Sequence, residues 1–145
     1  MTKQQSRKTV AILLGLTAVL TAAFWVTFFA DYDRQARSYF ARECESWFLW
    51  ERSFPAADLY LAAVCLLAAI GLWKARSWGI LFSLLGGSAL IFLGLVDALF
   101  FLQNGLYTPF NTDVLVEIVI HVWALAFGPF VILYAWRRRT DLLAG

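Results

Sequence analysis

Four long apolar stretches constrain the fold of this chain more than any other feature. They cover residues 10–30, 56–73, 78–102 and 114–136. Because the hydrocarbon core of a bilayer is about 30 Å thick, a helix needs roughly 20 apolar residues to cross it. Lipid offers no hydrogen-bond partners to the backbone, and no stretch here alternates like a barrel strand. The sequence therefore predicts four membrane-spanning helices.

The composition agrees with this interpretation. Of the 145 residues, 61% are hydrophobic and 15% are charged, whereas soluble domains are about half apolar and about a quarter charged. A soluble domain of this size could not bury so much apolar surface. We predict a single all-α integral membrane domain over residues 1–145, in which four helices form a bundle. Small residues recur along one face of each predicted helix, for example Gly87 in the third and Gly128 in the fourth. Such faces predict close packing between the helices.

The first stretch shares some features with a secretory signal peptide. Lys3, Arg7 and Lys8 precede it, and residues 21–23 are small enough for a cleavage site. However, the apolar run continues through residues 24–30, which is longer than a signal core requires. The sequence therefore favours a first helix that is retained.

Basic residues indicate how the bundle is oriented. Eight of them lie at the N-terminus, in the link at residues 74–77 and after the fourth stretch, whereas the opposite side has four arginines among five acidic residues. Because basic residues concentrate in cytoplasmic loops, we predict that both termini are cytoplasmic and that the protein lies in the plasma (inner) membrane. Arginines beside a membrane helix mark topology, so we expect no nucleic-acid partner.

Residues 31–55 separate the first two spans and have a helical pattern of their own. Apolar residues recur three or four positions apart from Tyr32 to Phe48, and charged residues occupy the other face. The pattern predicts an amphipathic interfacial helix on the outer surface of the membrane. There Trp47 and Trp50 would cover a pocket as a lid, or the helix would serve only as an anchor.

Ionisable side chains occur inside three of the four predicted spans. Asp58 lies in the second, Asp97 in the third, and Glu117 and His121 in the fourth. In an antiparallel bundle all four come to a similar depth in the outer half. A charge at membrane depth costs several kcal/mol, so such residues usually face a bundle interior, a wet cavity or one another. The shared depth predicts an outward-facing polar pocket.

We expect this pocket to bind a small or lipid-like ligand. The candidate ligand-binding residues are Asp58, Tyr60, Asp97, Gln103, Asn104, Glu117 and His121. Asp58 and Asp113 could instead cap the N-termini of their helices. Asp97, Glu117 and His121 could also form a hydrogen-bonded network that only stabilises the bundle.

A membrane-embedded enzyme is the alternative function. A histidine beside carboxylates can titrate near neutral pH, so His121 with Glu117 and Asp97 could perform acid–base catalysis in an isomerase or hydrolase. The same three residues offer ligand types for zinc, manganese or iron, but a single histidine without an HExxH motif does not predict a metal site. We therefore expect no metal and no other cofactor.

The remaining expectations concern partners and cysteines. Membrane lipid, a second copy of the chain or another membrane protein are the expected partners. An oligomeric transporter is a weaker alternative, because four helices are few for alternating access. Cys44 and Cys65 lie at different depths and form no CxxC motif, so we expect them to remain unpaired.

Overall fold

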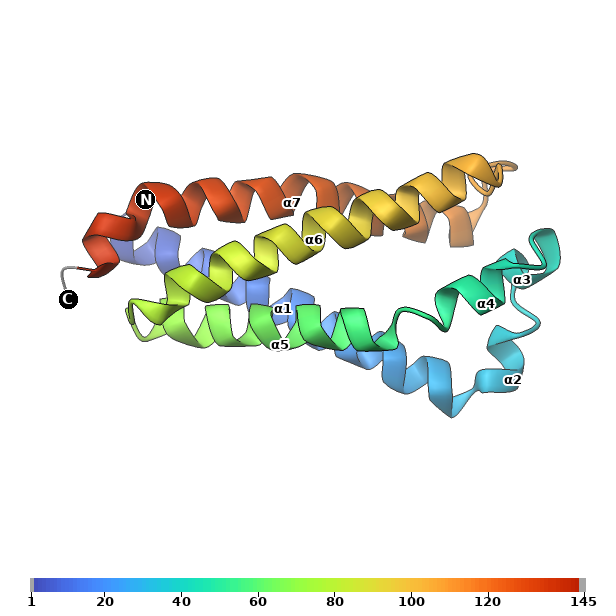
Figure 1. Cartoon of the computed structure of the whole chain (residues 1–145), viewed down its shortest axis with the longest axis horizontal. Coiled ribbons are helices and arrows are strands. Elements are labelled where there is room, and N and C mark those ends of the chain that lie inside the picture. The colour runs from blue at the N-terminus through green and yellow to red at the C-terminus, as the bar shows by residue number, and fades with distance from the viewer. Residues whose placement is uncertain (1, 144–145) are drawn as a thin grey trace.

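The computed structural model describes the backbone of residues 2–143 and the side chains of residues 2–140. Its long helices are α1 (Lys3–Ala30), α5 (Pro55–Trp73), α6 (Trp78–Gln103) and α7 (Thr112–Leu143). Each of these helices contains an apolar window long enough to cross a membrane. They form one elongated all-α bundle, as predicted (Figure 1).

Two of the helices extend beyond the apolar stretches that predict them. The helix α1 begins at Lys3 because Thr2 and Gln5 form a capping box: each backbone N–H donates to the side chain of the other residue. At the other end of the chain, α7 continues through the basic residues 137–139 to Leu143. The basic residues at both termini are therefore carried on helix and not on loose tails.

The segment between α1 and α5 is helical, but it is divided into three short helices. These are α2 (Tyr32–Gln35), α3 (Tyr39–Glu43) and α4 (Trp47–Glu51). The helix α3 is capped by Ser38, whose Oγ accepts a hydrogen bond from the backbone N–H of Ala41, and it stops before the extended backbone of Cys44. The sequence pattern predicted one continuous helix here, because periodicity records the apolar face but not these interruptions.

The interruptions let the segment fold back onto the bundle. Phe40 and Trp47 are both buried, and the ring of Phe40 contacts the rings of Trp47 and of Phe101 in α6, with centroids 5.6 and 5.0 Å away. Phe101 therefore anchors the segment to α6. The aromatic side chains that would lie in the headgroup region of a flat interfacial helix are instead part of a small second core with Leu106 and Val114.

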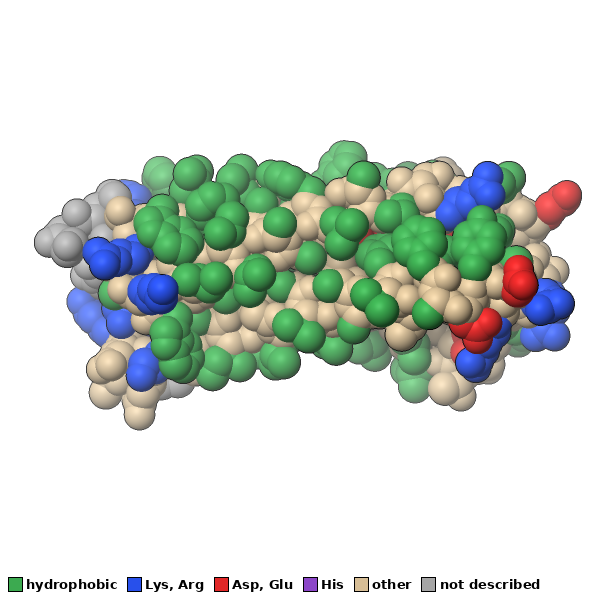
Figure 2. All heavy atoms as spheres, turned by 90° about the horizontal axis from the view of Figure 1, so that it is seen from below, with side chains coloured by type: hydrophobic (Ala, Val, Ile, Leu, Met, Phe, Trp, Pro, Cys, Tyr) green, Lys and Arg blue, Asp and Glu red, His purple; other side chains and the backbone are tan. Residues whose placement is uncertain are grey.

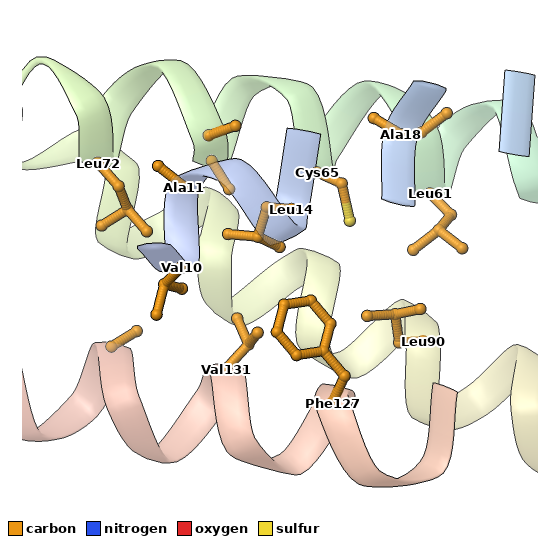
Figure 3. Packing of buried hydrophobic residues seen from close by; sticks show 14 of the residues in the cluster. Val10, Ala11, Leu14, Ala18, Leu61, Cys65, Leu72, Leu90, Phe127 and Val131 are labelled. Atoms are coloured by element: carbon orange, nitrogen blue, oxygen red, sulfur yellow. The ribbon is translucent and has the colours of Figure 1, made fainter. Parts of the chain in front are cut away.

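The main core is built from all four long helices. Leu14 of α1, Cys65 of α5, Leu90 of α6 and Phe127 of α7 point toward one another in its centre (Figure 3). Helices that are consecutive long elements pack closely, whereas α1 and α7 approach each other much less. A hydrogen bond of 3.1 Å from Trp123 Nε1 to Thr17 Oγ1 joins α7 and α1.

Glycine pairs set the closest approaches between helices. A Cβ added to Gly71 would lie 2.5 Å from the Cα of Gly79, where α5 meets α6. A Cβ added to Gly87 would lie 2.8 Å from the carbonyl oxygen of Gly128, where α6 meets α7. Because lipid is as apolar as the side chains, close backbone packing has to replace the hydrophobic effect between membrane helices. Small residues were predicted to let the helices pack closely, and the structure shows such packing between Gly87 and Gly128.

The surface separates into a belt and two ends. Hydrophobic side chains cover the middle of the bundle, and charged side chains gather at its two ends (Figure 2). One end, which we call the termini end, carries both chain termini and the 74–77 link; the other, the loop end, carries α2–α4 and the loop at 104–111 (Figure 1). This distribution is typical of a protein whose middle is surrounded by lipid.

The glycine contact yields a matched pair of variants. In Gly87→Ala the new methyl group would collide with backbone of α7, which cannot rotate away, so we expect a loss of about 1–3 kcal/mol of stability. In Gly15→Ala the methyl group would meet only the Cβ of Ala69, at an ordinary 3.8 Å. Thermal unfolding in detergent should show a lower midpoint for Gly87→Ala and an unchanged or higher one for Gly15→Ala. Equal midpoints would contradict the packing argument.

Candidate polar site and adjoining cleft

A chain of three polar side chains joins α6, α7 and the loop between them. The Nε2 atom of His121 lies 2.9 Å from Oδ2 of Asp97, and its Nδ1 lies 2.9 Å from the hydroxyl of Tyr107. The His121 side chain is 5% exposed and that of Asp97 is 25% exposed. The stretch around Asp97 is otherwise apolar, so these contacts provide the partners that a carboxylate at this depth requires.

The Tyr107 hydroxyl can serve either neutral tautomer of His121. When Nε2 carries the proton, it donates to Asp97, and Nδ1 accepts the hydroxyl proton of Tyr107. When Nδ1 carries the proton, it donates to the tyrosine oxygen, and the hydroxyl can donate to the carbonyl oxygen of Ala98, 3.4 Å away. Burial, together with the carboxylates of Asp97 and Glu117, raises the pKa of Tyr107, so its hydroxyl keeps its proton at neutral pH.

Tryptophans supply further donors to the partly buried carboxylates of Asp97 and Asp58. Trp50 in α4 donates from Nε1 to the second oxygen of Asp97 at 3.3 Å, and its ring stacks on that of Phe100. Trp25 in α1 donates from Nε1 to Asp58 at 3.0 Å. From the sequence, Trp50 was predicted only as part of a lid, and no role was predicted for Trp25. The available signal was that an indole N–H in an apolar setting needs an acceptor.

Two helix caps differ from the interpretation of the sequence. Asp58 lies in the first turn of α5 but makes no capping hydrogen bond, because its carboxylate accepts from Trp25. At the start of α7 the cap is Asn111, whose Oδ1 accepts from the backbone N–H of Val114 at 3.0 Å. Asp113 lies within the first turn instead. Neither carboxylate therefore caps its helix through a hydrogen bond, although both lie in a first turn, where the helix dipole favours a negative charge.

Glu117 completes the group around His121. One potential ligand atom from each of Asp97, Glu117 and His121 lies within 4.8 Å of the others. Among the described residues the side chain of Glu117 forms no hydrogen bond. The structure thus brings together the three residues that the sequence named as catalytic candidates, and their catalytic role stays a prediction. Loss of turnover in a folded His121→Ala variant is the measurement that would support it.

A fourth carboxylate, Glu51 at the end of α4, was missed by the sequence analysis. Its pKa is raised well above the ordinary value of 4.5, first because the carboxyl is buried and then because the carboxylates of Asp97, Glu117 and Asp58 repel its charge. The amphipathic pattern of residues 31–55 predicted a surface position for Glu51. The fold-back of α4 onto α6 brings it beside the polar group.

Three predicted ligand-binding residues lie outside this group. Tyr60 is half exposed on α5. Gln103 and Asn104 are exposed where α6 ends, and Asn104 Nδ2 donates to the carbonyl oxygen of Phe100 at 2.8 Å. Asn104 therefore takes part in ending the helix. A role for these three in ligand binding stays a prediction.

A cleft of about 550 Å³ adjoins the polar group at the loop end. Its walls come from α1, from the α2–α4 segment and from the first turns of α7, and Glu117 is part of its lining. The charged residues that line it are Arg34, Arg37, Arg42, Asp113 and Glu117. Glu117 therefore belongs both to the cleft and to the group around His121.

Two buried hydrogen-bond donors belong to residues that line the same cleft. The Nε1 atom of Trp47 and the hydroxyl of Tyr39 are buried, and neither has a hydrogen-bond partner among the described residues. A buried donor without a partner costs about 1–3 kcal/mol. The cleft thus combines charges of both signs with two donors that the rest of the described chain does not satisfy.

Comparisons of the chain with protein-family models, with curated proteins and with solved structures found no match.

Replacing Asp97 tests whether the polar chain stabilises the bundle. In Asp97→Leu, the ring of His121 and the indole N–H of Trp50 both lose their acceptor, which should cost about 1–3 kcal/mol for each donor left buried. Asp97→Asn keeps one acceptor oxygen and should be tolerated better. Thermal unfolding in detergent measures both variants. An Asp97→Leu protein as stable as the wild type would show that the network contributes nothing to stability.

The position of Glu51 predicts a pH-dependent gain from Glu51→Gln. Below the ordinary pKa of 4.5, Glu51 is protonated in both the folded and the unfolded chain, so it adds no pH dependence there. As the pH rises through this value, the unfolded chain loses the proton first, and the folded state loses stability until its own higher pKa is passed.

The glutamine variant does not ionise. Its advantage in unfolding temperature over the wild type should therefore grow with pH across this window and then level off. Glu45→Gln, at an exposed position, is the control and should show no such growth. The measurement should run from about pH 4, near the reference pKa of glutamate, to about pH 8. A difference in unfolding temperature between Glu51→Gln and the wild type that stays constant over this range would contradict the prediction.

Proposed function

We propose that the protein binds an amphiphilic, lipid-like molecule with a zwitterionic headgroup in the cleft at the loop end. The observation that carries this proposal is the lining of the cleft. Guanidinium groups bind phosphate through paired, charge-assisted hydrogen bonds, and three arginines are present. Asp113 and Glu117 offer carboxylates to an ammonium group on the same ligand. Trp47 and Tyr39 also line the cleft, and their buried donors have no partner among the described residues.

The walls of the cleft also suit the apolar part of such a molecule. Phe24 of α1 and Val116 of α7 both line it, and both are exposed on the surface of the apolar belt. They stand on either side of the seam between α1 and α7, two helices that approach each other little. An acyl chain bound at the cleft would extend along this seam toward the middle of the bundle, where lipid and protein offer similar apolar surroundings.

We further infer that both termini are cytoplasmic and that the cleft faces the outer leaflet of the plasma (inner) membrane. The support is the charge distribution. The termini end carries the eight basic residues of the N-terminus, the 74–77 link and residues 137–139. The loop end balances its arginines with acidic residues. A basic end facing the cytoplasm is the arrangement that membrane insertion favours.

Lipid retention tests the binding function. The full-length protein, purified in mild detergent, should retain about one phospholipid per chain and bind a fluorescent short-chain phosphatidylethanolamine saturably. Val116→Trp should fill part of the cleft and weaken probe binding at least tenfold, which corresponds to about 1.4 kcal/mol. Val122→Trp is the matched control, because Val122 is an exposed valine of the same helix that does not line the cleft. Equal losses in both variants, or probe binding unaffected by Val116→Trp, would contradict the proposal.

Cysteine labelling tests the orientation. In a chain carrying Cys44→Ser and Cys65→Ala, a cysteine at the exposed Thr108 should react with a membrane-impermeant maleimide added outside intact cells. A cysteine at the exposed Ser77, in the link at the termini end, should react only after the membrane is permeabilised. The opposite pattern would reverse the orientation and place the cleft in the other leaflet.

A further inference from the structure

We propose that Asp97, Glu117 and His121 form a binding site for one divalent transition-metal ion, with Zn²⁺ the ion bound most tightly among zinc, iron and manganese. One nitrogen and two carboxylate oxygens converge within 4.8 Å of one another at the loop end of α6 and α7. This site shares Glu117 with the cleft, whereas its other two ligands, Asp97 and His121, do not line the cleft.

The charges around the site favour a cation. Glu51 and Asp58 both interact electrostatically with Asp97, so two further carboxylates add negative charge to the two that lie beside His121. Within the described side chains, no lysine or arginine forms an ion pair with any of the four. Several carboxylates in a partly buried, apolar setting repel one another and are costly to keep ionised without a compensating positive charge. A divalent cation held by two of them would offset much of this repulsion.

The ligand set distinguishes between classes of metal. An imidazole nitrogen with two carboxylate oxygens suits zinc, iron or manganese, whereas calcium and magnesium prefer six or more oxygen ligands. Affinity at a given site rises from manganese through iron to zinc. The sequence could not predict this set from a motif, because its members come from two helices and only Glu117 and His121 have a fixed spacing.

A small side-chain movement would bring the three ligand atoms to coordination distance, with the fourth tetrahedral position left open. Ligands about 2.1 Å from one zinc ion lie about 3.4 Å apart in tetrahedral geometry, and the present separations reach 4.8 Å. Glu117 has no hydrogen bond to another described residue that would resist a rotation toward His121. Asp97 is already held on its other oxygen by Trp50, as a ligating carboxylate commonly is.

Tyr107 supplies the second support that such a site requires. Metal binding at Nε2 of His121 requires that nitrogen to present its lone pair, so the ring proton has to lie on Nδ1. That N–H then donates to the oxygen of Tyr107, 2.9 Å away. The tyrosine hydroxyl then donates its own hydrogen bond to the carbonyl oxygen of Ala98. The ring proton thus moves from Nε2 to Nδ1 and stays on the imidazole. The histidine therefore binds the metal as a neutral ligand whose orientation is fixed by Tyr107.

Metal titration of the full chain in detergent tests the site. Isothermal titration with ZnCl₂ should give one ion per chain, and a millimolar excess of MgCl₂ should not displace it. His121→Gln and Glu117→Gln should each weaken Zn²⁺ binding at least 100-fold, while Asp113→Asn, which removes a carboxylate of the same helix outside the site, should leave it unchanged. Tyr107→Phe removes only the support of Nδ1 and should weaken binding 10- to 100-fold.

The absorption spectrum of the Co²⁺-loaded wild-type protein gives a second readout that does not depend on any variant folding. Visible bands without a thiolate charge-transfer band are expected from nitrogen and oxygen ligands. A thiolate band would assign the ion to Cys44 or Cys65 and overturn the proposal. So would the absence of saturable Zn²⁺ binding by the folded wild-type protein, or a folded His121→Gln protein that binds Zn²⁺ as tightly as the wild type.

Discussion

A carboxylate in an apolar bundle needs a hydrogen-bond donor, and this requirement connects most of the structure. Asp58 receives the indole N–H of Trp25, and Asp97 receives that of Trp50 together with the imidazole of His121. Each donor comes from a different segment from its acceptor. The polar contacts therefore tie α1 to α5, α4 to α6 and α6 to α7, and they fix the path of the connecting segment over the loop end.

The glycine contacts complement these polar ties. Close backbone packing at Gly87 and Gly128 holds α6 and α7 together in the middle of the bundle, and Gly71 with Gly79 does the same for α5 and α6 near the termini end. No pair of this kind joins α1 to α7 among the described residues. The seam between these two helices is accordingly where the cleft is found, beside Glu117.

The sequence carries enough information to predict the spans and the depth of the polar residues, since apolar length and helical rise determine both. It also predicts that Asp97, Glu117 and His121 come together, because lipid exposure of any one is costly. It could not predict that Trp50 and Glu51 reach this group, because periodicity in residues 31–55 does not record where the backbone turns. The sequence also could not predict that Asn111, and not Asp113, caps α7, since both residue types cap helices well.

The exposed apolar rim of the cleft has a consequence for how occupancy would be controlled. With Phe24 and Val116 at the membrane-facing surface, a bound amphiphile would exchange by lateral diffusion within one leaflet and not through bulk water. Its occupancy would then follow the mole fraction of that amphiphile in the leaflet. A cell that changed its headgroup composition would change the bound fraction of this protein without altering how much of the protein it makes.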